Sequence, residues 1–264
     1  MNGSKYLSQL IDLSALKTDA LNIIKAPTGS GKTYFALTAI PHSIGEKSIW
    51  QVVYLIDTIN GKDQILRNYK AYAYCKMWDA IATGETLYWG DGEESVVIMT
   101  YAKFGQLLET RPDFHKQFKY IICDELPSAI QYQYFEKRPN LCSLALHGLE
   151  RAVKNDNTTV IALTATPNQI PANFDAPYNF VPIDEAELIH YTVDEVQKYT
   201  NLEYLIEHVN TNETGICYVK HITKMIEIEN KAIQCGLHPV SIWSINNAEY
   251  DMTDAQIAAR ESIL

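Results

Sequence analysis

The chain has 264 residues, 47% of them hydrophobic and 20% charged, which is the composition of a globular protein with one large or two modest domains. A formal net charge of −10 argues against a surface that binds nucleic acid over its whole extent, while leaving room for a local basic region. The five cysteines show no CxxC spacing, residues 1–10 contain no apolar signal core, and no apolar run approaches membrane-spanning length. We therefore expect a cytoplasmic protein without a zinc site, a disulfide framework or a membrane segment.

The first predicted element is a helix over Tyr6–Leu16, whose leucine and isoleucine side would pack beneath a sheet. Gln9 lies on this helix, shortly before a glycine-rich loop, where its amide could bind the edge of an adenine. An exposed glutamine on a helix surface is the preferred explanation. The adenine contact is therefore a secondary hypothesis.

The next stretch predicts a strand, a phosphate-binding loop and a helix. Leu21–Lys25 is a β-favouring apolar run, residues 26–31 form a loop with two glycines, and helical spacing follows until Pro41, which is expected to end the helix. Glycines let several backbone N–H groups converge on a polyphosphate, Lys32 supplies a cation for the β and γ phosphates, and the Thr33 hydroxyl is suited to Mg²⁺. A tight turn without a ligand is the simpler alternative. The expected nucleotide ligands are Pro27, Thr28, Gly29, Ser30, Gly31, Lys32 and Thr33.

Two further buried strands are predicted at Gln51–Ile56 and Ser95–Met99, with a helix over Lys62–Tyr72 between them. Thr58 and Thr100 each follow one of these strands. Ligands of an open α/β sheet bind at the carboxyl ends of its strands. Each threonine taken alone is more often a cap than a ligand contact.

Two adjacent carboxylates follow the predicted strand Lys119–Cys123. Partly buried carboxylates at the end of an apolar strand cost folding free energy unless a cation pairs with them. Mg²⁺ would bind Asp124, directly or through water, and Glu125 would act as the general base on the attacking water, with Lys32 as the second catalytic residue. The alternative is a strand that ends in two solvated acids.

The remaining elements of the first domain are a polar aromatic connector at Tyr132–Pro139, a helix over Cys142–Val153 and a strand over Thr159–Leu163. The strand runs into Thr164 and Thr166. Small hydroxyl residues at this position can cap the turn, or can relay a change at the γ-phosphate to a neighbouring surface.

Composition changes to Pro, Asn and Asp from residue 168 to about 184, which suggests a domain end and a linker. We therefore expect a first domain over residues 1–182 and a second unit over 183–264. The second unit is predicted to contain a helix at Leu202–Val209, a strand at Gly215–Val219, a helix at Ile222–Cys235, a strand at His238–Trp243 and a final helix before residue 264. One βαβ unit cannot cover both faces of its sheet, so this domain is expected to be incomplete.

The order of these segments resembles the first motor domain of the DEAD/DEAH-like superfamily two helicases. By this resemblance, residues 26–33 (APTGSGKT) are motif I, Thr58 and Thr100 lie in motifs Ia and Ib, residues 124–127 (DELP) are motif II and residues 164–166 (TAT) are motif III. Residues 215–219 (GICYV) with Lys220 and His221 resemble motif IV. Gln9 lacks the flanking pattern of a Q-motif, and DELP differs from the tetrapeptides that name the subfamilies.

The resemblance implies an α/β fold: a RecA-like P-loop NTPase domain with a mostly parallel sheet, followed by the opening of a second RecA-like domain. It implies an ATP-dependent helicase or translocase that uses Mg²⁺ and binds single-stranded DNA or RNA, with Thr58 and Thr100 as nucleic-acid contacts and Thr164 and Thr166 as coupling residues. No paired-arginine helix like motif VI and no motif V is recognisable, so a truncated chain with slow hydrolysis is expected.

Two other functions stay open from the residues alone. A P-loop ATPase could switch a protein partner without touching nucleic acid, which the acidic balance and the aromatic connector would suit. A nucleotide-binding structural module without turnover is the third hypothesis. Stimulation of hydrolysis by single-stranded nucleic acid separates the three.

Overall fold

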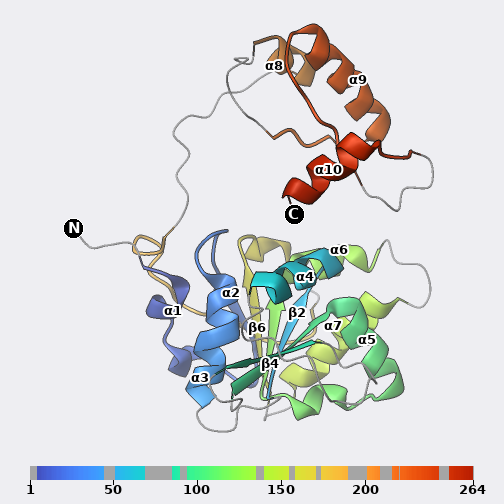
Figure 1. Ribbon diagram of the computed structural model, residues 1–264. Coiled ribbons are helices and arrows are strands. Elements are labelled where there is room, and N and C mark those ends of the chain that lie inside the picture. The colour runs from blue at the N-terminus through green and yellow to red at the C-terminus, as the bar shows by residue number, and fades with distance from the viewer. Residues whose placement is uncertain are drawn as a thin grey trace. The chain divides into compact units, whose positions relative to one another are not determined.

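The computed structural model describes residues 5–44, 51–68, 85–89, 94–134, 140–154, 158–170, 174–189, 201–208, 216–219, 221–243 and 250–263. The chain divides into two compact units, Met1–Thr192 and Val193–Leu264, and each is described by itself (Figure 1). The connector at Tyr132–Pro139 and the end of the helix predicted over Lys62–Tyr72 lie partly outside the described residues.

The first unit is built on one seven-stranded sheet in the order β3-β4-β2-β5-β6-β1-β7. Six strands run parallel, and β3 pairs antiparallel with β4 at one edge. The strands are β1 (Leu21–Lys25), β2 (Val52–Ile56), β3 (Glu85–Trp89), β4 (Glu94–Thr100), β5 (Tyr120–Asp124), β6 (Thr159–Thr164) and β7 (Tyr178–Phe180). The predicted α/β fold with a mostly parallel sheet is confirmed, and β3 is an addition that the sequence analysis missed.

Helices cover both faces of this sheet (Figure 1). They are α1 (Leu7–Leu10), α2 (Lys32–Tyr34), a π-helical segment (Phe35–Ala39), α3 (Ile40–Ile44), α4 (Ile59–Asn68), α5 (Tyr101–Thr110), α6 (Leu126–Tyr132) and α7 (Leu141–Val153). Short 3₁₀ turns lie at Leu13–Ala15, Phe114–Gln117 and Pro167–Gln169. Parallel strands buried on both faces need such a covering, which is why their sequences read as continuous apolar runs.

Each face of the sheet has its own apolar core. One contains α5, α6 and α7 packed on the side of β2 that carries Val53 and Leu55. The other contains α1, the helix after the glycine-rich loop and α4, packed on the side that carries Tyr54 and Ile56. Alternation along β2 therefore assigns neighbouring residues to opposite cores.

Helices α5 and α7 approach each other closely at two glycines. A Cβ atom built on Gly105 would lie 1.9 Å from the main-chain oxygen of Leu141, and one on Gly148 would lie 2.1 Å from a methyl group of Leu108. Packing therefore requires the glycine at 105, where the contact is with backbone, whereas the contact at Gly148 is with a leucine methyl that can move.

A fully buried asparagine joins three segments at the start of β1. The amide of Asn22 donates to the main-chain oxygens of Lys17 (2.7 Å), Ala20 (3.2 Å) and Val160 (2.9 Å). Its oxygen accepts from the Lys17 N–H and from the Asn179 amide, both at 2.8 Å. These contacts tie β7 and the residues before β1 into the sheet.

The first unit extends ten residues beyond the expected boundary at 182. Strand β7 pairs with β1, and Val181 and Leu188 are buried in the core beside α1. Lys5 and Leu188 form a parallel bridge, with Lys5 N–H to Glu187 oxygen at 2.7 Å and Ile189 N–H to Lys5 oxygen at 2.8 Å. The Pro- and Asn-rich composition thus marks an edge of the sheet rather than its end.

Two helix predictions near the N-terminus were wrong. The helix expected over Tyr6–Leu16 is interrupted, because Ile11 and Asp12 are extended and the Asp12 carboxylate accepts from the Ser14 N–H at 2.9 Å. The loop helix does not end at Pro41 but continues to Ile44. The π-helical segment Phe35–Ala39 ends two residues before the proline, and such a wide turn is where a helix tolerates a missing N–H group.

The second unit contains α8 (Leu202–His208), α9 (Ile222–Gln234) and α10 (Asp254–Ile263), close to the helices expected there. A small core of Ile206, Ile228 and Ala232 joins α8 and α9. The described parts of the two predicted strands, 216–219 and 238–243, belong to no β-ladder, so these predictions were wrong. Short extended segments form strands only where partners pair with them.

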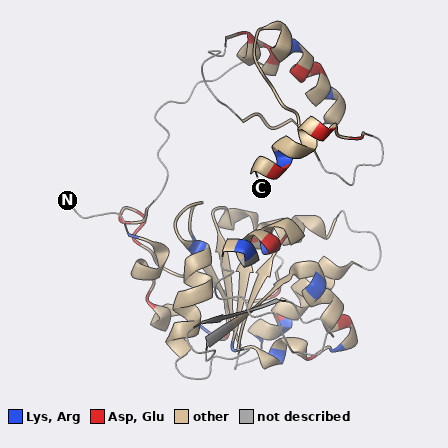
Figure 2. Cartoon of the chain, in the orientation of Figure 1, with Lys and Arg blue, Asp and Glu red and all other residues tan. Residues whose placement is uncertain are grey.

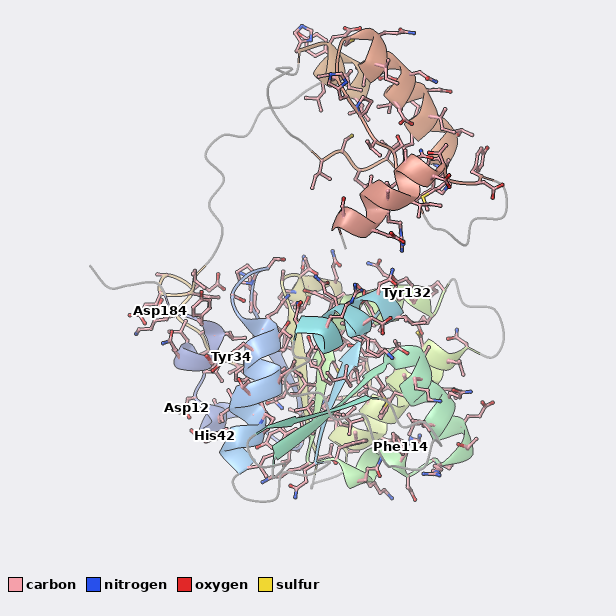
Figure 3. All side chains as sticks on the ribbon, in the orientation of Figure 1. Asp12, Tyr34, His42, Phe114, Tyr132 and Asp184 are labelled. Atoms are coloured by element: carbon pink, nitrogen blue, oxygen red, sulfur yellow. The ribbon has the colours of Figure 1, made fainter. Side chains whose placement is uncertain are left out.

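Charged residues of both signs are interspersed over the helices of each unit (Figure 2). Tyr34 on α2 and Tyr132 at the end of α6 are exposed aromatic residues of the first unit (Figure 3). Within the described part of the chain, no helix combines the length and apolar character needed to span a bilayer.

Candidate active site

The glycine-rich loop after β1 has the backbone that a phosphate cradle needs. Gly29 and Gly31 adopt φ angles of 80° and 87°, a left-handed region that side chains disfavour. Ser30 is fully buried, and its hydroxyl donates to the Pro27 oxygen at 2.7 Å, while Thr28 and Gly29 are exposed. Lys32 begins α2 directly after the loop. The predicted strand, loop and helix are all present.

The N-terminal segment braces this loop, a contact that the sequence did not indicate. Leu7 donates its N–H to the Ser30 oxygen at 2.9 Å, and a Cβ on Gly31 would lie 3.2 Å from the Tyr6 ring. Gln9 is exposed, and its side-chain oxygen accepts from the Tyr6 N–H at 2.9 Å. Gln9 thus caps α1, and its contact with adenine stays a prediction.

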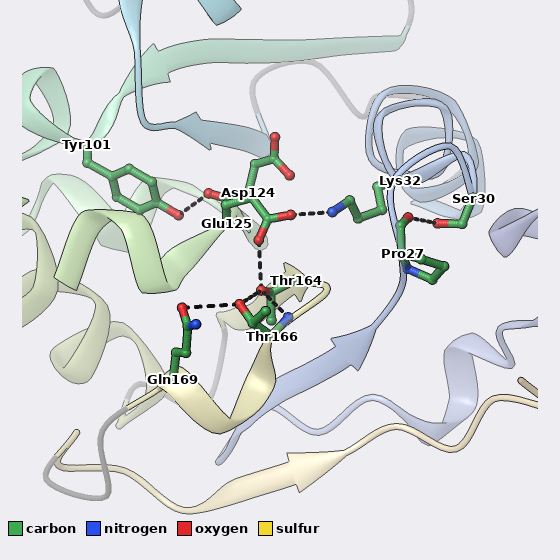
Figure 4. A network of polar contacts seen from close by, with 9 residues as sticks. All are labelled: Pro27, Ser30, Lys32, Tyr101, Asp124, Glu125, Thr164, Thr166 and Gln169. Atoms are coloured by element: carbon green, nitrogen blue, oxygen red, sulfur yellow. Dashed lines mark hydrogen bonds and ion pairs between the residues drawn. The ribbon is translucent and has the colours of Figure 1, made fainter. Parts of the chain in front are cut away.

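Lys32 and the acid pair meet at the carboxyl edge of the sheet (Figure 4). Asp124 ends β5, and Glu125 follows with φ 42°, the one left-handed residue other than glycine in the described chain. One Glu125 oxygen forms an ion pair with the Lys32 ammonium, and the other accepts from the Thr164 hydroxyl at 2.8 Å. The left-handed backbone of Glu125 thus accompanies a side chain that is held by one partner from α2 and one from β6.

Strand register explains why these residues meet. Lys25 of β1 lies beside Thr164 of β6, and Asp124 of β5 lies beside Leu163 of β6. Strand β6 therefore separates the phosphate loop from the acids and presents Thr164 between them. Parallel strands make this edge the place where loops from several strands converge.

Asp124 is a mostly buried carboxylate. Burial is the main cause that raises the pKa of Asp124 to about 6, and the nearby Glu125 and Asp57 carboxylates act in the same direction. The Tyr54 hydroxyl and the Lys32 ammonium act to lower this pKa. Tyr101 donates its hydroxyl to the main-chain oxygen of Asp124 at 2.9 Å. The carboxylate therefore lies in surroundings that favour either a proton or an additional cation.

The threonines at the end of β6 form a short polar chain with the Glu125 carboxylate (Figure 4). Thr164 is fully buried, and its hydroxyl oxygen accepts from the Thr166 N–H at 3.1 Å. Thr166 is exposed and donates its hydroxyl to the Gln169 side chain at 3.3 Å. Gln169 was not identified from the sequence, although the 3₁₀ turn at Pro167–Gln169 follows Thr166 directly and brings the two side chains together.

A comparison with known protein families matches the part of the chain that contains the whole candidate site. The family model described as "Type III restriction enzyme, res subunit" matches residues 4–169, from the N-terminal brace to Gln169. This chain belongs to that family. The match includes the phosphate loop, the acid pair and the threonines after β6, so it confirms the resemblance to DEAD-like superfamily two helicases.

Two individual proteins are also similar to this family member. An ATP-dependent DNA helicase, Hel308, from Aeropyrum pernix is 31% identical over 106 residues, which is 40% of this chain and 14% of that helicase. A crystal structure of a DEAD box protein from Methanococcus jannaschii is 17% identical with a TM-score of 0.41, covering 92% of this chain and 66% of that one. The chain thus spans a small part of its helicase relative.

The residues of this family member fit a magnesium ion. Asp124 and Thr33 offer carboxylate and hydroxyl oxygens, the ligand type that Mg²⁺ prefers. The raised pKa of Asp124 reflects a buried charge that a divalent cation would compensate. Lys32 and the loop N–H groups would hold the phosphates that share such an ion. Asp124 and Thr33 remain the predicted metal ligands.

The two predicted nucleic-acid threonines of this family member cap helices in the free protein. The Thr58 hydroxyl accepts from the Gly61 N–H at 3.1 Å at the start of α4, and the Thr100 hydroxyl accepts from the Lys103 N–H at 3.2 Å at the start of α5. Thr100 ends β4 and Thr58 follows β2, and both strands end at the same edge as the acids. Their contact with nucleic acid stays a prediction.

Proposed function

We propose that this chain carries the ATP-binding motor domain of a nucleic-acid helicase or translocase, which hydrolyses ATP with Mg²⁺ to move on, or remodel, DNA or RNA. The observation that supports it best is the meeting of Lys32 from the loop after β1 with Glu125 from the end of β5 at one sheet edge. Membership of the res-subunit family supports the same role.

Each side chain has a distinct task in this proposal. The backbone around Gly29 and Gly31 binds the phosphates, and Lys32 leaves Glu125 to pair with them. When bound, Mg²⁺ neutralises charge that develops on the transferred phosphoryl group. Thr33 and Asp124 are its ligands. Glu125, released from Lys32, accepts a proton from the attacking water.

Thr164 links the Glu125 carboxylate to Thr166. Its hydroxyl donates to Glu125, and its oxygen accepts from the Thr166 N–H. A movement of Glu125 after Lys32 leaves it would alter the Thr164 contact, which supports coupling from the nucleotide to the exposed Thr166 and Gln169.

Nucleic acid is proposed to lie along the strand ends that carry Thr58 and Thr100. Contacts there would be made mainly with phosphates, so they should show little sequence preference and should weaken steeply with salt. The two threonines would contribute by fixing the first turns of α4 and α5.

Two measurements test the proposal. Nucleotide binding comes first: saturating Mg²⁺-ADP at about 100 times its dissociation constant should stabilise the fold by about 2.7 kcal/mol, and Lys32→Ala should abolish the shift. An unchanged melting temperature would contradict a nucleotide site.

ATPase activity with and without single-stranded DNA or RNA then separates the functions. Stimulation by either nucleic acid supports the motor. Hydrolysis without stimulation supports the alternative, a P-loop ATPase that switches a protein partner, and tight binding without hydrolysis supports a structural nucleotide-binding module.

A further inference from the structure

Tyr54 occupies the middle of β2 and is fully buried in the core that contains the loop helix. The register pairs it with Ile122 of β5. Residues two apart on a strand share a face, so Asp124 lies on the same face as Tyr54, one step toward the carboxyl edge. The polar neighbours of the Tyr54 hydroxyl are accordingly the Asp124 carboxylate and the Thr33 hydroxyl.

This hydroxyl has no hydrogen-bond partner of standard geometry among the described protein groups. Among the described residues, the buried side-chain atoms without one are Tyr54 Oη and His115 Nδ1. The Tyr54 hydroxyl lies close enough to the Asp124 carboxylate to lower the pKa of that group, and Thr33 is its other polar neighbour. Its geometry nevertheless falls short of a formed hydrogen bond to either side chain. An unpaired buried hydroxyl is costly, and phenylalanine would fill the same space without that cost.

Tyr101 provides a direct comparison on the opposite side of β5. It is also almost fully buried and close to Asp124, yet its hydroxyl donates to the Asp124 main-chain oxygen at 2.9 Å. One tyrosine thus supports the backbone of the acid in the free protein. The other directs an unused donor at the carboxylate.

We propose that Tyr54 is a positioning residue for the magnesium ion, whose hydroxyl donates to the Asp124 carboxylate and fixes its orientation when Mg²⁺-nucleotide binds. The inference rests on the proposed function, since it assumes that Asp124 and Thr33 are metal ligands. Outer partners of this kind typically contribute about 10–100-fold to metal affinity. Tyr54 would act through Asp124 and would not touch the nucleotide.

The test is Tyr54→Phe in the full chain, with Tyr101→Phe as the matched control. Binding of a fluorescent ADP is titrated with Mg²⁺ and repeated in EDTA. For Tyr54→Phe, the Mg²⁺ concentration at half-saturation should rise about 10–100-fold. Its ADP affinity in EDTA should equal that of the wild type, which also shows that the variant is folded.

The melting temperature of the free protein gives an independent readout. It should not fall in Tyr54→Phe, because the removed hydroxyl has no partner there, whereas it should fall in Tyr101→Phe, which loses a hydrogen bond.

Three results overturn the inference: an unchanged Mg²⁺ dependence, an equal loss of ADP affinity with and without Mg²⁺, or a lower melting temperature of free Tyr54→Phe. If wild-type protein showed no Mg²⁺-dependent nucleotide binding, the proposed function would fail first and the inference with it.

Discussion

Glu125→Gln tests the site most directly, because Glu125 has two different partners in the free protein. One oxygen pairs with Lys32, and the other accepts from the Thr164 hydroxyl. A nucleotide phosphate that takes Lys32 must first break the ion pair, so the pair opposes nucleotide binding. Glutamine keeps the volume and can still accept from Thr164, but it cannot act as a base or pair with a cation.

The strength of this competition follows from burial. The Lys32 side chain is 12% exposed and that of Glu125 is 34% exposed. The strength of the pair should therefore lie between that of a surface ion pair and that of a buried charged hydrogen bond, and we expect it to contribute about 1 kcal/mol. Its loss should tighten binding of Mg²⁺-nucleotide by about fivefold while hydrolysis falls to background.

The assay is a fluorescence titration of wild type and Glu125→Gln with a labelled, non-hydrolysable ATP analogue in Mg²⁺. The affinity difference should shrink as salt is raised, because salt screens a partly exposed ion pair. Weaker or equal binding by the variant at low salt would refute the competition. Wild-type turnover in the variant would refute the base assignment.

Three further predictions concern the scaffold. Gly105→Ala places a methyl group against the main-chain oxygen of Leu141 and should lower the stability by about 1–3 kcal/mol in a thermal melt. Gly148→Ala meets a leucine methyl group that can move, so its loss of stability should be smaller. Equal losses for the two variants would contradict this packing. Asn22→Leu strands several buried carbonyl groups and should cost about 3 kcal/mol or more in urea unfolding, so a smaller loss would show that other donors replace its amide. Burial and the Arg151 charge lower the pKa of His115, so the folded state binds fewer protons than the unfolded state and loses stability as pH falls below about 6.5. His115→Leu should therefore flatten the decline of the melting temperature in this pH range. An unchanged profile would show that His115 does not cause the decline.

Apolar runs predicted the strands of the sheet well. Leu21–Lys25 and the core of β2, β4, β5 and β6 were found because strands buried on both faces carry an uninterrupted apolar signal. Helix α6 was missed, although Pro127 in its first turn is a start signal that could have revealed it. Strand β3 was missed because no such run marks residues 85–89.

The candidate site was only partly accessible from the sequence. Lys32, Asp124 and Glu125 stand in recognisable motifs, but their contacts depend on register across three strands. The Lys32–Glu125 pair, the left-handed backbone of Glu125 and the unused Tyr54 hydroxyl are products of tertiary packing. Local pattern carries no information about them.

The bridge between Lys5 and Leu188 has a mechanical consequence. Lys5 holds the chain on both sides of this bridge, through Glu187 and Ile189, and Leu7, two residues later, holds the Ser30 oxygen of the phosphate loop. Tension applied to the chain beyond Ile189 would load these backbone hydrogen bonds first and reach the loop through only two intervening peptide links. The N-terminal segment thus links the glycine-rich loop to the chain that leaves the first unit.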